Sequence, residues 1–136
     1  KIKKVDFFDE NFFLFFEEID LCHRLKTIGE NIFIDPNIKI FHEGGSSSDN
    51  DFIDEINIIK NWHWMWSTFY YHKKHKTFFI ALFITLPKFT ASLLKFIFSL
   101  LTFKKKKSVI YFYRLSGFIN ALSGKMSWFR GRNLDT

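Results

Sequence analysis

The spacing of apolar residues predicts a helix near the start of the chain, followed by two short strands. Within residues 14–28 apolar side chains recur at steps of seven, four and three, which places them on one helical face (Leu14, Leu21, Leu25 and Ile28). Gly29 stands where a glycine commonly ends a helix. Residues 31–35 and 38–42 alternate as strands do, and Pro36 and Asn37 form a turn between them.

A polar loop and long apolar segments follow. Residues 43–51 read EGGSSSDND, which cannot support a packed element. Residues 52–74 then predict a helix whose second half is strongly aromatic. Residues 77–103 carry only the charges of Lys88 and Lys95, and this length would be enough to span a membrane. Pro87, however, is expected to break the segment near its middle.

The polar residues after Pro87 form a narrow helical stripe instead of being scattered. They follow one another at steps of four, three, four, three and four: Lys88, Ser92, Lys95, Ser99, Thr102 and Lys106. The remaining positions are almost all Phe, Leu, Ile or Ala. Such a pattern is typical of a helix that lies in a membrane interface, and also of a core helix with one narrow solvent-exposed face.

The flanks of this segment favour the membrane. Trp62, Trp64 and Trp66 precede it, and tryptophan is enriched at the level of lipid headgroups. Lys73 and Lys74 lie before it and KKKK follows at 104–107, and each such lysine contributes about 1 kcal/mol near an anionic leaflet. We therefore expect an aromatic and basic tail that binds an anionic membrane surface through these tryptophans, Lys73, Lys74, Lys88 and Lys95.

Charge is divided unevenly along the 136 residues. The chain has a net charge of +6, but residues 1–60 carry −6 and residues 61–136 carry +12. This asymmetry indicates an acidic half that handles a cation or a polar substrate and a basic half that meets an anionic surface. The single cysteine, Cys22, excludes an internal disulfide and is best explained as a small buried residue.

The acids of the first helix are candidate functional residues. Glu17, Asp20 and Arg24 fall on one helical face, and Asp20 and Arg24 form a favourable i,i+4 pair. Glu18 points roughly 100° away from Glu17 around the helix. One acid can thus be neutralised by Arg24 while another stays ionised, which is how two carboxylates acquire different roles. The alternative is a solvated acidic helix start.

The order of motifs over residues 5–48 resembles the C-terminal part of the catalytic domain of family 2 glycosyltransferases, in particular bacterial rhamnosyltransferase-like enzymes. The resemblance rests on these pieces in sequence order: Phe8-Asp9-Glu10, the aromatic run 12–16, Glu17-Glu18, Asp20-Leu21, Arg24, Gly29, the segment 31–34, and His42 with Gly44, Gly45 and Ser46. The tail adds a Lys-His pair, Lys74-His75, an apolar segment and the glycines Gly117 and Gly124.

The resemblance implies an α/β fold. Residues 1–51 would be the acceptor-side part of a GT-A, Rossmann-like catalytic domain with two or three short strands. Residues 52–136 would be a helical, membrane-associated tail, so that the chain is mostly helical. The family's nucleotide-binding half, with its Asp-x-Asp metal motif, would lie upstream of the matching region, and we expect this chain alone to be inactive.

The resemblance also implies roles for single residues. Glu18 would be the general base that deprotonates an acceptor hydroxyl, while Glu17, Asp20 and Arg24 would bind the acceptor. His42 would approach a divalent Mg or Mn ion that neutralises the leaving diphosphate, although the chain by itself offers no Asp-x-Asp partner for it. Gly44, Gly45 and Ser46 would belong to a loop that closes over substrate.

The expected reaction is sugar transfer with inversion from a nucleotide-sugar donor to a hydroxyl of a lipid-linked or polysaccharide acceptor. It would serve cell-surface polysaccharide synthesis at the cytoplasmic face of the bacterial inner membrane, by a peripheral tail or a kinked, membrane-inserted one. An alternative is a non-catalytic membrane-surface interaction module. Nucleic acid is not an expected partner, because the cations flank apolar runs instead of interleaving with polar ones.

Overall fold

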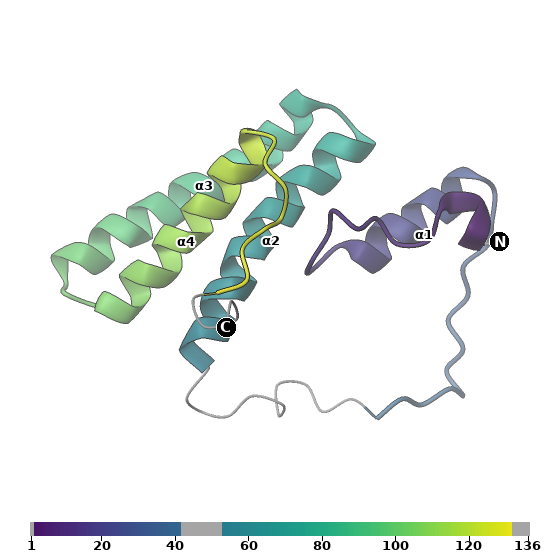
Figure 1. Ribbon diagram of the computed structural model, residues 1–136, viewed down its shortest axis with the longest axis horizontal. Coiled ribbons are helices and arrows are strands. Elements are labelled where there is room, and N and C mark those ends of the chain that lie inside the picture. The colour runs from purple at the N-terminus through teal and green to yellow at the C-terminus, as the bar shows by residue number, and fades with distance from the viewer. Residues whose placement is uncertain (1, 42–52, 132–136) are drawn as a thin grey trace.

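The computed structural model describes residues 2–41 and 53–131, and all the regular secondary structure in these residues is helical (Figure 1). A short 3-10 helix, η1, comes first, and four α-helices follow. Their bounds are Ile2–Val5 for η1, Glu17–Thr27 for α1, Ile53–His75 for α2, Phe78–Leu101 for α3 and Lys105–Leu122 for α4. Helices α2, α3 and α4 pack against one another, and α1 lies beside the C-terminal half of α2.

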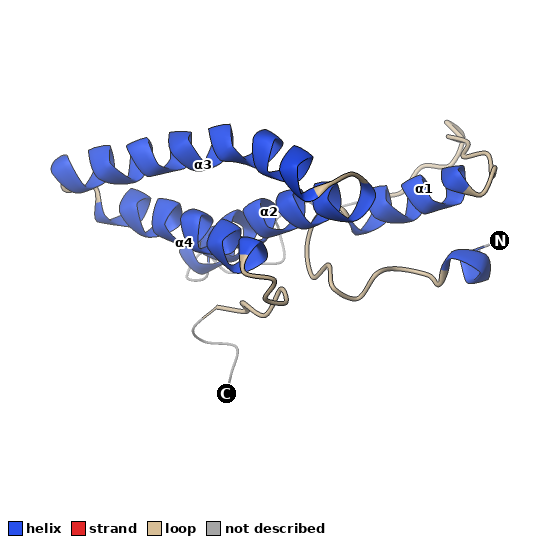
Figure 2. Ribbon diagram, turned by 90° about the horizontal axis from the view of Figure 1, so that it is seen from above, coloured by secondary structure: helices blue, strands red, loops and turns tan. Residues whose placement is uncertain are grey.

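The expectation of an α/β fold with two or three short strands is wrong for this structure. Residues 31–35 and 38–41, which alternate like strands, belong to no sheet (Figure 2), whereas the predicted turn at Pro36 and Asn37 is confirmed. A strand needs a neighbouring strand to satisfy its backbone groups, and the described parts of the chain contain no extended segment that pairs with either of them. Their apolar side chains are therefore open to solvent, with Ile34 93% and Phe41 94% exposed.

Helix α1 is shorter than its predicted range because the aromatic run before it is not helical. Phe15 and Phe16 both have a positive φ, of 68° and 72°, and α1 begins only after them. The predicted end is confirmed. Gly29 has a φ of 80°, and the amides of Gly29 and Glu30 donate to the carbonyls of Lys26 and Leu25 at 3.0 and 3.1 Å, which is a Schellman motif.

The core is built mainly from aromatic residues of α2. Trp62, Met65 and Phe69 have no exposed surface, and Trp66 is 2% exposed. They pack against side chains from the N-terminal arm (residues 5–16), α3, α4 and the C-terminal segment (residues 125–130). These side chains are Phe12, Ala81, Phe118, Ala121 and Phe129. Because Phe12 belongs to this cluster, the core crosses the boundary that the sequence suggested between residues 51 and 52.

Helices α2 and α4 approach each other closely at Gly117. A Cβ atom on this residue would lie 2.2 Å from the backbone oxygen of Trp62. Only glycine therefore allows this helix crossing, so Gly117 has a packing role.

Helix α3 runs without interruption through Pro87, so the expected break is absent. Both halves of α3 place buried residues on the side that faces the other helices, Ala81 and Thr85 before Pro87 and Ser92 and Ser99 after it. This common packing holds the two halves in one helix although proline removes a backbone hydrogen bond. Two residues of the predicted polar stripe, Ser92 and Ser99, thus point into the protein, whereas Lys95 and Thr102 are exposed, and most of the large apolar side chains point outward.

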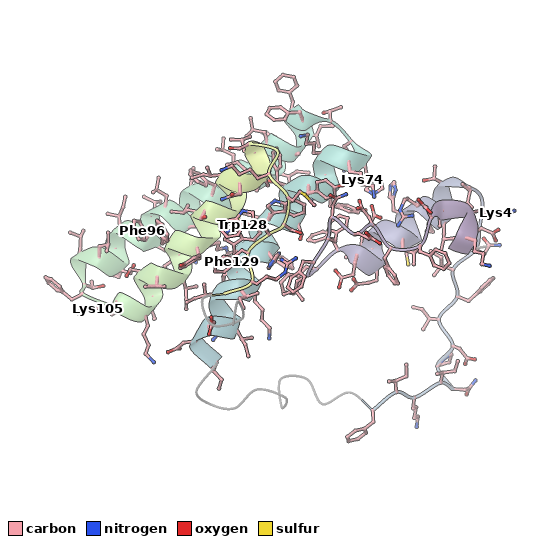
Figure 3. The ribbon with its side chains drawn as sticks, viewed as in Figure 1. Lys4, Lys74, Phe96, Lys105, Trp128 and Phe129 are labelled. Atoms are coloured by element: carbon pink, nitrogen blue, oxygen red, sulfur yellow. The ribbon has the colours of Figure 1, made fainter. Side chains whose placement is uncertain are left out.

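A C-terminal segment, residues 125–130, runs back along α2 and fastens the N-terminal arm to it (Figure 3). The indole of Trp66 donates to the carbonyl of Lys125 at 2.9 Å, and the ring of His63 donates from Nε2 to the carbonyl of Phe129 at 2.8 Å. The hydroxyl of Ser127 donates to the carbonyl of Asn11. Segments from opposite ends of the described chain are therefore joined over the same face of α2.

Candidate functional site

Asp20 is the centre of a polar cluster between α1 and the C-terminal end of α2. Its side chain has no exposed surface. One carboxylate oxygen lies 2.7 Å from Nε of Arg24, and the other lies 2.7 Å from Nζ of Lys74 and 2.6 Å from Nε2 of His75. Burial opposes ionisation of this carboxyl, but the hydrogen bonds from Lys74, His75 and Arg24 outweigh it and lower its pKa.

Arg24 ties the N-terminal arm to this cluster. Its Nη1 donates to the carbonyl of Val5, and its Nη2 donates to the carbonyl of Phe7 at 2.6 Å. The predicted i,i+4 pair of Asp20 and Arg24 is confirmed, and the structure gives both residues a positioning role. Asp20 is fully engaged by these partners, whereas Arg24 also lines an open pocket. The expectation that the two residues bind the acceptor stays a prediction.

Lys74 links Asp20 to a second carboxylate, Asp9. Its Nζ lies 2.7 Å from Oδ2 of Asp9, and the hydroxyl of Tyr70 donates to the same oxygen at 3.0 Å. Burial opposes ionisation of Asp9, but hydrogen bonds from Lys74, Asn11 and Tyr70 lower its pKa to about 2. Burial and the contact with Asp9 raise the pKa of Tyr70 to about 12. At neutral pH the cluster therefore holds two carboxylates and a protonated phenol.

An open pocket of about 570 Å³ lies against this cluster. Its walls are residues 5–11 of the N-terminal arm on one side and Arg24 and Lys74 on the other. Figure 3 shows Lys74 at the end of α2 that is nearest to α1. The size is within the range of pockets for small ligands, and the walls combine carboxylates, cations and aromatic rings. Such a lining suits a polyhydroxylated ligand better than an apolar one.

The two adjacent acids at the start of α1 have different surroundings. Glu18 is exposed, and no hydrogen bond or ion pair joins it to the described residues. Glu17 is half-buried, and its Oε2 atom is enclosed without a hydrogen-bond partner in the same part of the chain. Asp20, two residues after Glu18, faces α2, so Glu18 projects from the opposite side of α1.

The predicted metal ligand and loop lie outside the described residues. This applies to His42 and to Gly44, Gly45 and Ser46. Within residues 2–41 and 53–131, no three His, Cys, Asp or Glu side chains come together as a metal-binding group. Cys22 is a half-buried thiol.

The predicted membrane residues divide into core and surface. Trp62 and Trp66 are buried in the core, whereas Trp64 is 39% exposed. Lys73 and Lys95 are exposed, Lys88 lies over the ring of Trp64 at 5.9 Å, and Lys74 is engaged with the two aspartates. Helix α3 is long and apolar enough to cross a membrane, with a mean hydropathy of 1.6 in its most apolar window.

Sequence reasoning from the acid run alone missed Asp9, Tyr70 and His75 as members of the cluster. The available signal was the Lys74-His75 pair, which stands at the end of an otherwise apolar and aromatic helix. Two adjacent basic residues at that position require a nearby acid if they are to be half-buried. The partner lies 55 residues away from His75 in sequence, so the pattern could not identify it.

No protein-family model matches the chain, and neither a characterised protein nor a solved structure matches it.

Proposed function

We propose that this chain forms the acceptor side of a membrane-associated glycosyltransferase. In this proposal a sugar passes with inversion from a nucleotide-sugar to a hydroxyl of a lipid-linked or polysaccharide acceptor, for bacterial cell-surface polysaccharide synthesis at the cytoplasmic face of the inner membrane. The observation that carries it is the meeting of two motif pieces: Asp20 of the acid run and the Lys74-His75 pair share one buried cluster beside an open pocket.

Glu18 is the general base in this proposal. A sugar hydroxyl is a poor nucleophile at neutral pH, so a positioned carboxylate that accepts its proton accelerates attack on the anomeric carbon by about 10²–10⁴-fold. Glu18 is suited to this because it is exposed on α1 and the described residues do not neutralise it. Asp20, which three cationic or imidazole groups already surround, is not available for that role.

The polar cluster around Asp20 fixes the position of α1, the helix that carries Glu18. Asp20 joins α1 to α2 through Lys74 and His75, and Arg24 joins α1 to the arm at residues 5–7. A base is effective only when its position is fixed relative to the hydroxyl that it serves. The reacting hydroxyl would lie at Glu18, on the exposed side of α1. The pocket between the arm and Lys74 does not include Glu18, so it would take a further sugar unit of the acceptor, with Asp9 and Glu10 as hydrogen-bond acceptors at its edge.

The donor and the metal enter from outside the described residues. A divalent Mg or Mn ion would neutralise the diphosphate that leaves, and His42 is its proposed ligand from this chain. The nucleotide-sugar itself would bind to a second half with an Asp-x-Asp motif. The chain by itself is therefore proposed to be inactive.

The test is sugar transfer by membranes that contain this chain together with a nucleotide-sugar-binding half. Replacement of the base, Glu18→Gln, is expected to lower turnover at least 100-fold while leaving the chain folded. Asp54→Asn removes a different exposed acid and should leave turnover unchanged. Equal turnover of Glu18→Gln and the unaltered chain would contradict the assignment of the base.

The alternative function, a non-catalytic membrane-surface module, rests on the outward apolar face of α3 and makes no use of the pocket. Isothermal titration of the chain with lipid-linked sugar acceptors in detergent discriminates between the two. Saturable binding that the pocket substitution Lys74→Gln weakens supports the acceptor site, whereas no heat of binding with any sugar acceptor favours the module.

A further inference from the structure

Helix α3 has an apolar stripe that no part of the described chain covers. Phe83 is 81%, Leu94 68% and Leu101 72% exposed. The stripe follows the outer side of α3 at steps of three and four residues, and it consists of Phe79, Phe83, Leu86, Thr90, Leu94, Ile97 and Leu101. Figure 2 shows α3 along one edge of the molecule, with α2 and α4 on its other side. A continuous apolar surface of this length requires an apolar neighbour.

The side of α3 that faces the protein carries several buried hydroxyl residues, beside Phe89, whose ring packs against Phe118. Thr85 has no exposed surface, and Ser92 and Ser99 are each 3% exposed. A water-soluble bundle would place the large apolar residues inside and these hydroxyls outside. The reverse order, with small residues at the helix contact and large apolar residues outside, is the arrangement of a helix whose surroundings are lipid.

Every hydroxyl of α3 is satisfied by its own helix. Thr85 donates to the carbonyl of Ala81 at 2.6 Å, Ser92 to that of Lys88 at 2.7 Å and Ser99 to that of Phe96 at 2.7 Å. Thr90, the one polar residue of the outer stripe, donates to the carbonyl of Pro87 at 3.0 Å. No hydroxyl of the helix therefore has to retain a water molecule when it enters an apolar medium.

The neighbours of α3 show how it would lie. Helices α2 and α4 contact it and are polar, and the charged groups that they carry include Asp54 and Lys60 on α2 and Arg114 on α4. If α3 crossed the bilayer, these helices would enter the hydrocarbon with it, and each charge near its centre would be strongly unfavourable. A helix that lies flat buries only its outer stripe.

Cations stand where a flat helix would meet lipid headgroups. Lys104 and the first residues of α4, Lys105–Lys107, follow the last turn of α3, and the side chain of Lys106 is 82% exposed. Lys95 is exposed on the flank of the stripe, and Lys76 is exposed just before α3 begins. Each of these cations is attracted to an anionic surface. The charge and the apolar stripe together fit an anionic bilayer.

We propose that α3 lies flat in the headgroup region of an anionic bilayer, with the stripe in contact with acyl chains and with α2 and α4 on the water side. The inference does not depend on sugar transfer. It differs from the orientation that the sequence suggests, because Ser92 and Ser99 of the polar stripe face the neighbouring helices, while Lys95 stays exposed. It also sets the pocket close to the membrane, since Lys74 precedes the first residue of α3 by only four positions.

The test measures the depth of three positions along the stripe. Single nitroxide labels are placed by Phe83→Cys, Leu94→Cys and Leu101→Cys in a Cys22→Ser background, and the full chain is bound to vesicles of phosphatidylcholine with 30% phosphatidylglycerol. Depth is measured from the accessibility of each label to oxygen and to a water-soluble nickel complex. A Lys60→Cys label, on an exposed residue of α2, reports the water side.

A flat helix predicts the same depth for all three stripe labels, several ångströms below the phosphates, and a water-exposed Lys60→Cys label. A spanning helix would separate the labels at 83 and 101 by about 27 Å along its axis and thus overturn the proposal. Labels that stay accessible to the nickel complex in the presence of vesicles would overturn it too. The proposal would also be overturned if the labels were inaccessible to the nickel complex without vesicles and the chain sedimented as a dimer. That result would mean that a second copy of the chain covers the stripe.

A charge-matched pair of variants gives an independent measurement. Phe83→Glu with Leu94→Glu, and Lys60→Glu alone, each lower the net charge by two. The double variant changes two exposed positions, so the core is kept, and it should reduce the partition into vesicles at least tenfold more than Lys60→Glu does. Equal partition of the two variants would show that charge alone drives binding and would overturn the role of the stripe.

Discussion

At the scale of single residues, the most informative side chain is the Asp20 carboxylate. It is buried without exposed surface and contacts one guanidinium, one ammonium and one imidazole. A buried carboxylate is tolerated only when such partners replace its water. The i,i+4 pair with Arg24 was readable from the sequence, whereas the partners from α2 depend on tertiary packing that no local pattern encodes.

Asp20→Asn should lower the free energy of unfolding by about 3 kcal/mol, because it leaves Lys74 and Arg24 partly buried without their counter-charge. Urea unfolding followed by circular dichroism measures the change. Glu18→Gln is the matched control on the same helix, and its exposed side chain predicts a change within about 0.5 kcal/mol. Equal effects of the two substitutions would mean that the cluster does not stabilise the fold.

His63 makes stability depend on pH. Burial, opposed by the hydrogen bond to the carbonyl of Phe129, lowers its pKa from 6.5 to about 4. The unfolded chain takes up this proton below about pH 6.5 and the folded chain only below about 4, so stability falls as pH decreases through this window. The unfolding free energy should be about 2 kcal/mol lower at pH 5 than at pH 8.

The measurement is urea unfolding at pH 8, 6 and 5. His63→Gln, which retains an N–H donor, should flatten most of the pH dependence in this range, although His72, whose pKa burial also lowers, contributes in the same direction. The carboxyls of Asp9 and Asp20 do not interfere, because their lowered pKa values affect stability only at more acidic pH. An undiminished dependence in the variant would assign the effect elsewhere.

At the scale of elements, α1, α2 and the range of α3 were predictable, but α4 was not predicted as a separate helix and the orientation of α3 was not predictable. The ranges expected at 14–28, 52–74 and 77–103 correspond to α1, α2 and α3. Periodicity gives the angle between apolar and polar faces, but it does not say which face meets the protein. For α3 the answer depends on small residues that allow close packing, such as Ala81 and Ser92, and this became visible only in three dimensions.

Two neighbouring positions on α3 test this orientation. Ser92→Leu puts a large side chain into the buried face and should destabilise the fold by about 1–3 kcal/mol. Thr90→Leu makes a comparable change on the exposed stripe and should have little effect on stability. Thermal unfolding in detergent micelles measures both. If Thr90→Leu were the more damaging, the assignment of the two faces would be reversed.

The segment 31–41 shows the opposite limit of sequence reasoning. Its alternation predicted strands, yet in this chain it exposes Phe33, Ile34 and Phe41 almost completely. Alternation describes side chains, while a strand is held by backbone hydrogen bonds to a neighbour. A local pattern therefore cannot establish a sheet by itself, and residues 2–41 and 53–131 contain no segment that pairs with this one.

At the scale of the whole molecule, one core joins the N-terminal arm, the long helices and the C-terminal segment. The sequence predicted an aromatic α2 but assigned Trp62 and Trp66 to a membrane surface, because composition does not separate headgroup contacts from core contacts. The arm and the C-terminal segment enclose these rings through Phe12 and Phe129. From the sequence, only the common helical face of Glu17, Asp20 and Arg24 was predictable. The pocket beside the cluster was not, because residues 5–11 of the arm form one of its walls.

The crossing of α2 and α4 tests this assembly. Gly117→Ala would place a methyl group against the backbone of Trp62, so it should lower the unfolding free energy by about 3 kcal/mol despite the higher helix propensity of alanine. Gly124→Ala is the control: this residue has a φ of 71° and open space around it, and its cost should be only about 1 kcal/mol. Differential scanning fluorimetry followed by urea titration ranks the two variants.

The contact between Ser127 and Asn11 spans 116 residues, and it has a consequence for biosynthesis. Translation delivers the arm 116 residues before Ser127, so the arm must wait until α2, α3 and α4 have been made before its partner exists. Loop closure over such a separation is slow compared with helix formation. The long helices, α3 included, are thus made before the acid cluster is enclosed, which gives the nascent chain time to reach a bilayer while the arm is still unattached.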